Sequence, residues 1–299
     1  SWKPYQVIAS GEGAMRDLRC SALILVCLSA LAIADDEATF QWKTVTEWIA
    51  LLSADDPATR KEAVESLAEI GPDAAKAVAA LAERLGDPEV GVRRSAAVAL
   101  GRIGPAAKEA APRLREALKD PDIEVRRAVA AALEAFGADT PDVVQALLDA
   151  LADPDHQTSW KAAQGLERLG PRVVRQLRDA AKEGTPRARA LAIGVLSTFG
   201  PLAMDALPDL MAAARDPDPG VRSSAISALG SLGPRAREAE AVLIETLDGT
   251  DADMRRRAAR SIEEHRLQTE EAVAAFVRAL EDKDEEVRST AMRAFTGLR

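Results

Sequence analysis

Few side chains in this sequence could carry out chemistry, and their spacing does not bring them together. The two histidines, His156 and His265, lie far apart in the chain, so a histidine-based metal site or catalytic triad has almost no material. The segment Glu263-Glu264-His265 lacks the Glu-x-x-His spacing of a metal-binding helix, and no second cluster supports it. We therefore predict a protein that is not an enzyme, with no catalytic residues, no metal site and no cofactor.

Residues 15–34 have the pattern of a signal peptide, and we expect residues 1–14 upstream of it to be disordered. Arg16 and Arg19 precede an apolar run at 22–34 that ends in Ala-Ile-Ala before acidic residues. The run is shorter than the ~20 apolar residues of a membrane span. We expect cleavage and export to a periplasmic or extracellular space, with an uncleaved membrane anchor at 22–34 as the alternative. Both cysteines lie in this leader, so the cleaved chain would carry no thiol.

The amino-acid composition favours a helical fold and argues against a nucleic acid as the partner. Hydrophobic residues make up 47% of the chain but aromatic residues only 3%, so the core must be built mainly from alanine, leucine and valine. Alanine is the best helix former and lets helices approach closely, while runs of alternating β-branched residues are almost absent. The formal net charge of −9 argues against binding the phosphate backbone of a nucleic acid.

An internal repeat governs the rest of the chain. An arginine after a small or β-branched residue recurs every 33 residues, with one spacing of 30, and a serine takes its place once. Eleven residues after most of these positions comes a glycine, usually followed by proline. A period this regular indicates a repeat architecture. The positions are Arg60, Arg93, Arg126, Ser159, Arg189, Arg222, Arg255 and Arg288.

Each repeat reads as two helices. The second helix is expected to begin at an Asp-Pro turn such as Asp120-Pro121, with the aspartate as N-cap and proline at the first helical position. In the repeat before it, apolar residues at 92, 96, 100 and 103 form one stripe, and Gly104 ends the helix. Neither helix can bury its stripe alone, so neighbouring repeats must stack. The shortened turn at 183–186 predicts a local change of superhelical pitch.

These motifs resemble HEAT repeats of the short bacterial type, including the HEAT-like repeats of phycobilisome lyases. The resemblance covers about residues 43 to 298 and implies an all-α fold, a right-handed α-α superhelix of about eight two-helix repeats. We expect the solenoid at residues 55–299. The residues that carry the resemblance include Pro112-x-Leu114, Asp120-Pro121 and Val125-Arg126, and again Pro208-x-Leu210, Asp216-Pro217 and Val221-Arg222.

The segment at 35–54 differs from the repeats. It contains Phe40, Trp42 and Trp48, an aromatic concentration found nowhere else in the chain. We interpret it as an N-terminal cap, with the first helix, that seals the end of the core.

The recurring arginine is expected to be structural, pairing with a turn aspartate of its own or a neighbouring repeat. The resemblance implies that the second helices line a concave face. On each of these helices, the residue after the recurring arginine should point into the groove, as should the residues four and eight positions further on. Two repeats carry only small residues there. Tryptophan and arginine often anchor interfaces, so the candidate partner-binding residues of this groove are Arg94, Arg102, Arg127, Trp160, Gln164, Arg168, Arg256 and Arg260. The alternative is that Trp160 packs between repeats and the arginines are solvated.

The function expected from these patterns is a non-enzymatic scaffold that binds a protein or peptide partner in its concave groove. An acidic peptide or a polyanionic glycan would suit a basic, aromatic-anchored groove. Two alternatives remain open: an accessory repeat module of a larger exported enzyme, and a chromophore-handling protein like the phycobilisome lyases. The motifs specify architecture and say almost nothing of activity.

Overall fold

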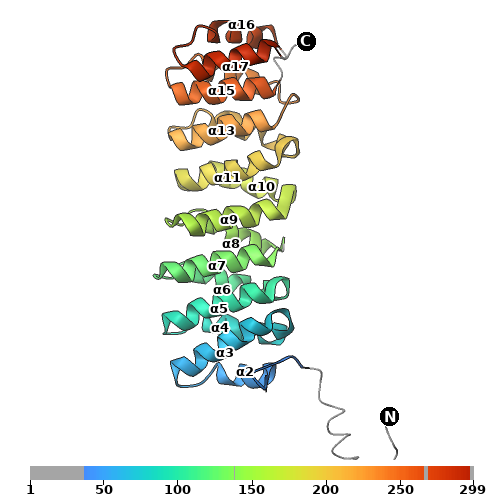
Figure 1. The fold of residues 1–299 in the computed structure, drawn as a ribbon, viewed down its shortest axis with the longest axis vertical. Helices are drawn as coiled ribbons and strands as arrows, with labels where there is room; N and C mark the ends of the chain where they lie inside the picture. The colour runs from blue at the N-terminus through green and yellow to red at the C-terminus, as the bar shows by residue number, and fades with distance from the viewer. Residues whose placement is uncertain (1–36, 138, 266–268, 297–299) are drawn as a thin grey trace, which may run out of the picture.

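The protein is a column of paired helices (Figure 1). It is known here from a computed structural model, which describes residues 37–137, 139–265 and 269–296. The predicted leader at 1–34 lies outside the described residues. Helices α2 to α17 form eight consecutive pairs, one pair to each repeat, which confirms the predicted all-α solenoid of two-helix repeats.

The helices form two rows along the column (Figure 1). The first helices of the pairs, here the outer row, are α2 (Val45–Leu51), α4 (Val78–Arg84), α6 (Ala111–Ala117), α8 (Pro141–Ala150), α10 (Val174–Lys182), α12 (Leu207–Ala213), α14 (Ala239–Leu247) and α16 (Glu270–Ala279). The second helices, here the inner row, are α3 (Pro57–Ile70), α5 (Val90–Ile103), α7 (Ile123–Phe136), α9 (His156–Leu169), α11 (Pro186–Thr198), α13 (Pro219–Ser231), α15 (Ala252–Glu264) and α17 (Glu285–Thr296).

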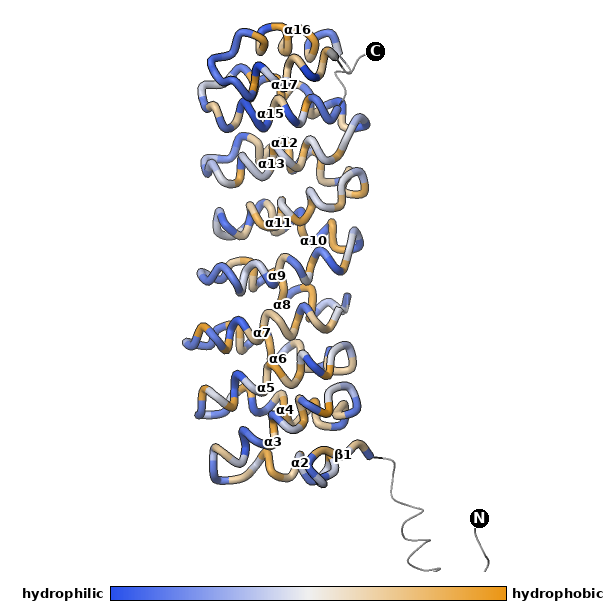
Figure 2. Tube along the Cα trace, in the orientation of Figure 1, coloured by the Kyte–Doolittle hydropathy of each residue, from blue (hydrophilic) through white to orange (hydrophobic). Residues whose placement is uncertain are grey.

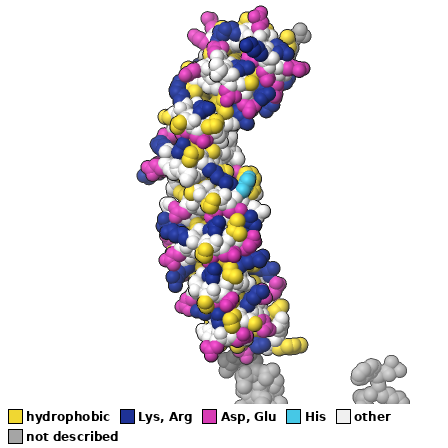
Figure 3. Space-filling model, turned by 90° about the vertical axis from the view of Figure 1, so that its left-hand side faces the viewer, with side chains coloured by type: hydrophobic (Ala, Val, Ile, Leu, Met, Phe, Trp, Pro, Cys, Tyr) yellow, Lys and Arg dark blue, Asp and Glu magenta, His cyan; other side chains and the backbone are white. Residues whose placement is uncertain are grey.

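The column is bowed, and the inner row lies on the inside of the bow (Figures 1 and 3). Consecutive inner-row helices pack against each other more extensively than consecutive outer-row helices do. Closer spacing along one row than along the other curves the stack toward the closer row. The inner row therefore presents the concave face, as the resemblance implied.

The core runs between the rows and from repeat to repeat. Val92, Ala96, Leu100 and Ile103 on α5 are almost fully buried, as the stripe in the sequence predicts. Figure 2 shows hydrophobic segments recurring in every repeat along the column. One connected cluster of buried apolar side chains extends from Val45 to the last repeat, so each repeat covers the apolar side of its neighbour.

Glycines inside the inner row allow the closest helix approaches. A Cβ placed on Gly101 of α5 would lie 3.0 Å from the Cα of Ala132 on α7, a backbone atom that cannot swing away. A Cβ on Gly230 of α13 would lie 2.6 Å from Oγ of Ser261 on α15. These two glycines, which lie inside α5 and α13, therefore serve helix packing.

A glycine also ends several inner-row helices. Gly104 has φ 73° and ψ −140°, a combination that only glycine adopts readily. A short 3₁₀ segment begins at this glycine, has proline as its second residue, and leads straight into the next outer-row helix. These segments are η1 (Gly71–Ala77), η2 (Gly104–Ala110), η3 (Gly170–Val173) and η4 (Gly200–Ala206).

Arginine–aspartate ion pairs join consecutive repeats along the edge where each outer-row helix turns into its inner-row partner, here called the turn edge. Arg93 donates from Nε and Nη2 to the carboxylate of Asp120 at 2.7 and 3.1 Å, and its Nη1 donates to the backbone oxygen of Asp87 at 2.9 Å. The arginine thus holds its own turn and the next repeat together. The five pairs, here called staples, are Arg60–Asp87, Arg93–Asp120, Arg126–Asp153, Arg189–Asp216 and Arg255–Asp282.

The staples correct one expectation from the sequence. The aspartate of the Asp-Pro turn is not the N-cap of the following helix, because its carboxylate accepts from the preceding repeat's arginine. The cap of α7 is Asp122, two residues later, whose side chain accepts from the backbone N–H groups of Glu124 and Val125. Proline 121 accordingly lies before the helix instead of at its first position.

The staples also keep their carboxylates charged. Burial alone would raise the pKa of Asp120, but hydrogen bonds from the Arg93 guanidinium and from the backbone N–H of Asp122 outweigh it, and the pKa lies below its ordinary value. A depressed pKa in the folded state adds stability above the unfolded pKa of about 4. That stability is lost as the pH falls through the folded pKa.

The N-terminal end carries a feature that the helical periodicity does not predict. β1 (Thr39–Phe40) and β2 (Lys43–Thr44) form a small antiparallel hairpin. Trp48 is buried and its indole N–H donates to the backbone oxygen of Phe40 at 3.1 Å, so it closes the end of the core. Trp42, at the hairpin turn with φ 66°, is fully exposed and does not contribute to that seal.

Replacing the glycine at the α5–α7 contact should destabilise the stack. Gly101→Ala gains helix propensity, but its methyl group must push α5 from α7, and we expect a net loss of about 1 kcal/mol in the free energy of unfolding. The matched control is Gly194→Ala on α11, where a Cβ meets nothing within 4 Å. That change should stabilise by ~0.5–1 kcal/mol. Denaturant unfolding measures both, and equal effects would contradict the close-packing role.

Breaking a staple should cost stability and remove part of its pH dependence. Asp120→Asn should lower the free energy of unfolding by about 2 kcal/mol at neutral pH, because the Arg93 guanidinium loses a charged partner in a largely buried site. The difference from wild type should shrink as the pH falls below about 4, since the native carboxylate is then being protonated. Glu116→Gln, an exposed acid paired with Arg113, should change little. Equal losses in the two variants, measured in urea, would argue against the staple.

Candidate functional site

The inner face, formed by the outward-pointing side chains of the inner row, contains all the predicted partner-binding residues. The side chains of Arg94 and Arg102 are exposed on α5, and Trp160 and Arg168 are exposed on α9. Gln164 is half-buried between them in sequence on α9. The residues therefore lie on one face, spread over repeats along the column.

Most of the predicted arginines are engaged in ion pairs with acids of the neighbouring helix. Arg102 pairs with Glu69 of the preceding repeat, and Arg168 lies 3.6 Å from Glu134 on α7. At the other end, Arg260 pairs with Glu286 on α17. The inner face is thus a surface of mixed charge, and the positive excess expected from the arginines alone is largely compensated.

Two of the arginines form a second set of inter-repeat pairs. Arg127 donates from Nε and Nη2 to Asp155 at 3.0 and 2.9 Å, and Arg256 pairs with Asp284 at 3.1 Å. The hydrogen bond from Arg127 is the main reason that the pKa of Asp155 lies well below its ordinary value. Asp155 also accepts from the backbone N–H of Thr158 and caps α9. Arg127 therefore fixes the helix start that carries Trp160.

Arg94 differs from the other predicted arginines, since it has no ion-pair partner among the described residues. It lines a pocket of about 550 Å³ at the N-terminal end of the inner face, between α3 and α5. Phe40 and Gln41 of the hairpin and Glu65 and Glu69 of α3 also line this pocket. The periodic pattern gave no sign of this pocket, because the hairpin that borders it stands outside the repeat.

The middle of the inner face is different in character. Trp160 is 48% exposed, and the ring of His156 contacts it edge-on with a centroid separation of 6.3 Å. The sequence analysis considered His156 only as a possible metal ligand or catalytic residue, but its spacing of four from Trp160 on one helix is a signal that could have indicated this contact. The amide oxygen of Gln164 is buried without a hydrogen-bond partner among the described residues. Two exposed aromatic rings thus lie beside an unsatisfied polar group.

Small uncharged side chains continue from Trp160 toward the C-terminus. α11 presents Ala190 and Gly194, and α13 presents Ser223 and Ser227, all half-buried. We call Trp160, Gln164 and these four residues the central patch. The charged side chains of α3 and α5 lie on one side of it along the column, and those of α15 lie on the other. A partner could approach the backbone of α11 and α13 closely, since no long side chain stands in the way.

The described residues include no group of three or more histidine, cysteine, aspartate or glutamate side chains placed to hold a metal ion. Within the same ranges, no helix has both the length and the apolar character to cross a bilayer.

Comparison with known families matches the sequence of the chain to one of them. The model of the family described as HEAT repeats matches the chain at residues 28–100, 45–133, 92–167, 174–262 and 239–296. The chain belongs to the HEAT-repeat family. HEAT repeats are typically scaffolds for protein interaction. In this chain the central patch lies on the inner face of the repeats.

Other comparisons add little. No curated protein matches the chain. Among solved structures, the crystal structure of an engineered protein is 23% identical, with 84% of this chain and 77% of that chain covered and a TM-score of 0.44. A likeness of this strength carries no argument about the function of the HEAT repeats described here.

Proposed function

We propose that this HEAT-repeat protein is a non-enzymatic scaffold that binds a protein partner on its inner face, with the central patch as the contact. The observation that carries the proposal is Trp160, an aromatic ring left half in solvent and followed along the inner face by the small side chains of α11 and then α13. Tryptophan supplies a large, rigid contact area and is enriched at the centre of interfaces. Small neighbours let the partner's backbone approach and surround the ring.

The charges on either side of the patch favour specificity over raw affinity. Arg102, Arg168 and Arg260 already have acidic partners, so a ligand that used them would have to displace those acids. Such rim charges mainly steer the approach of a partner and reject wrong ones. We therefore propose a partner segment with an apolar or aromatic residue for Trp160, flanked by charges of both signs. Arg94 has no ion-pair partner among the described residues, so it is the predicted position where an acidic residue of the partner would be favoured.

Removing the anchor should weaken binding. Trp160→Ala should reduce capture of at least one partner from an extract of the source cells, with a loss of about 2 kcal/mol or roughly 30-fold in Kd. The purified partner's affinity for each variant would be measured by titration calorimetry.

The matched control is Trp42→Ala, which removes an equally large exposed ring that lies outside the central patch. It should leave the affinity unchanged. A second variant, Ser227→Arg, places a long charged side chain on α13 and should weaken the same partner. Equal capture by wild type, Trp160→Ala and Ser227→Arg would rule out the central patch as the contact.

We also propose that the protein is exported, on the strength of the signal-peptide pattern at 15–34 alone. Expressed in a bacterium that exports it, the full chain should yield a product whose N-terminal sequence begins at Asp35. Leu25→Arg interrupts the apolar run and should keep the product inside the cell. A wild-type product that starts at residue 15 or earlier would contradict cleavage.

A further inference from the structure

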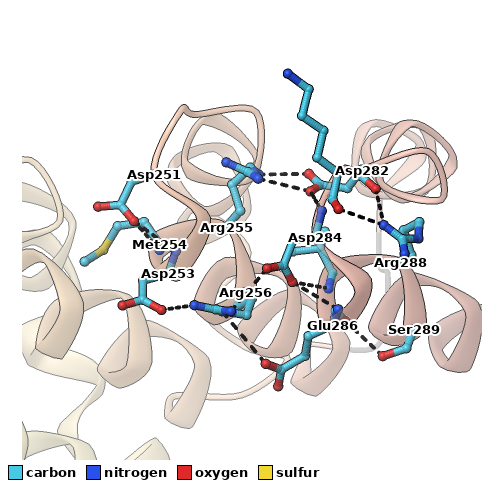
Figure 4. Close-up of polar contacts among 12 residues, drawn as sticks. Asp251, Asp253, Met254, Arg255, Arg256, Asp282, Asp284, Glu286, Arg288 and Ser289 are labelled. Carbon is cyan, nitrogen blue, oxygen red and sulfur yellow. Dashed lines mark hydrogen bonds and ion pairs between the residues drawn. The ribbon is translucent and has the colours of Figure 1, made fainter.

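The five staples share a common way of holding a carboxylate. In each, one carboxylate accepts from the guanidinium of the preceding repeat's arginine and also from the backbone N–H two residues further along its own turn. In the last staple (Figure 4), Asp282 accepts from Arg255 Nε and Nη2 at 2.8 and 3.1 Å and from the N–H of Asp284 at 2.7 Å. The protein thus repeats one carboxylate-binding arrangement along its turn edge.

At the junction between the repeats of α13 and α15, the arginine and the backbone N–H of this arrangement are present, but the aspartate is not. On α13, Arg222 Nη1 donates to the backbone oxygens of Asp216 and Pro217 at 2.9 and 2.8 Å, as the stapled arginines do in their own turns. The guanidinium is therefore held in the usual place. The residue 27 positions further on, an aspartate in all five staples, is Gly249.

Three donors are consequently left over. Arg222 Nε and Nη2 have no acceptor among the described residues, and neither does the backbone N–H of Asp251, which corresponds to that of Asp284 in the last staple. The neighbouring Asp248 does not fill the gap, because its carboxylate pairs with Arg278 on α16 at 2.7 Å.

The other interruption of the staples shows that such a gap is not a general feature. Between the fourth and fifth repeats the arginine itself is replaced by Ser159. There Arg187 of the following helix donates to Ser159 Oγ and to the backbone oxygen of Pro154, both at 3.1 Å. That junction has lost both members of the staple and leaves no guanidinium waiting for a carboxylate.

A pocket lies beside Arg222 and Gly249 at this junction. It has a volume of about 270 Å³ and is lined by Arg222, Gly249, Thr250 and Asp251, with Met254 as an apolar wall. Ligand sites for drug-sized molecules start at about 300 Å³, so this pocket suits a short group. We call it the turn-edge socket. Equivalent hollows of about 450 and 460 Å³ lie beside the Arg93–Asp120 and Arg126–Asp153 staples, so the free donors, and not the hollow itself, distinguish this junction.

We propose that the turn-edge socket binds a carboxylate on a short aliphatic stem, supplied from outside the helix stack. The guanidinium fork matches the two oxygens of a planar carboxylate, and the N–H of Asp251 supplies the third donor. The ionisable side chains around the pocket, Arg215 and Arg222 against Glu245 and Asp251, balance in charge. A monoanion therefore suits the socket better than a dianionic phosphate. The site lies away from the inner face and is independent of the proposed scaffold function.

Acetate is the probe that tests the socket, since it reproduces the end of an aspartate side chain. In ¹H–¹⁵N spectra, sodium acetate should shift the Asp251 amide and the Arg222 Nε–H signal saturably, while sodium chloride at equal ionic strength should not. Arg222→Lys keeps the charge but loses the fork, and should abolish the response. Gly249→Asp supplies the carboxylate covalently, after a small shift because its Cβ would lie 3.0 Å from the oxygen of Thr246, and should also abolish it.

The matched control is Arg215→Gln, which removes a positive charge from the same pocket while leaving the three donors in place. It should retain the saturable shift. A response equal for acetate and chloride, or one that persists in Gly249→Asp, would overturn the proposal. A parallel titration with N-acetyl-aspartate N-methylamide separates the sources: tighter binding than acetate identifies an acidic side chain of a protein as the ligand, and equal or weaker binding identifies a free small acid.

Discussion

The whole structure depends on one constraint, which is that no helix pair here can bury its apolar sides by itself. Each inner-row helix carries its stripe toward both the outer row and the next repeat, so the core exists only where repeats are adjacent. Alanine and glycine make this adjacency close: Gly101 lets the backbones of α5 and α7 meet without a side chain between them. At five of the seven junctions, a polar staple at the turn edge then fixes how one repeat sits on the next.

The fold could be derived from the sequence because its signals are local and repeated. The stripe at Val92, Ala96 and Leu100 and the terminating Gly104 each indicate a helix and its end, and a period of 33 residues implies that neighbours stack. The pairing of a recurring arginine with a turn aspartate was also predicted, and the Arg93–Asp120 pair confirms it. The sequence could not show, however, that this pairing excludes Asp120 from the N-cap position. The spacing of Asp120 fits an N-cap, but its carboxylate accepts hydrogen bonds from Arg93, which lies 27 residues earlier in the chain. The N-cap of α7 is therefore Asp122.

The sequence predicted which face of the column the candidate residues lie on. It did not predict that acids of neighbouring repeats would compensate the charge of their arginines. Helical spacing placed Arg127 and Trp160 correctly on the inner face. It could not show that Arg127 is held by Asp155, because that acid belongs to another repeat's turn and the pairing depends on how the helices are aligned. The N-terminal hairpin was missed for a different reason, since residues 39–44 lie outside the repeat and Trp42 looked like part of an aromatic seal. Side chains that follow the period are predictable, and those that depend on a neighbour's register are not.

The junction between α9 and α11 has a mechanical consequence. It lacks the arginine–aspartate pair, and its two inner-row helices pack less extensively than any other consecutive pair in that row. The three residues missing from this repeat were expected at the turn 183–186, but they fall in η3, which has four residues where η1, η2 and η4 have seven. A rod with one softer joint concentrates its bending there. Trp160 lies on one side of this junction and Ala190 on the other, so a ligand that contacts both would restrict bending between the two repeats. Binding of that ligand would then make the whole column stiffer.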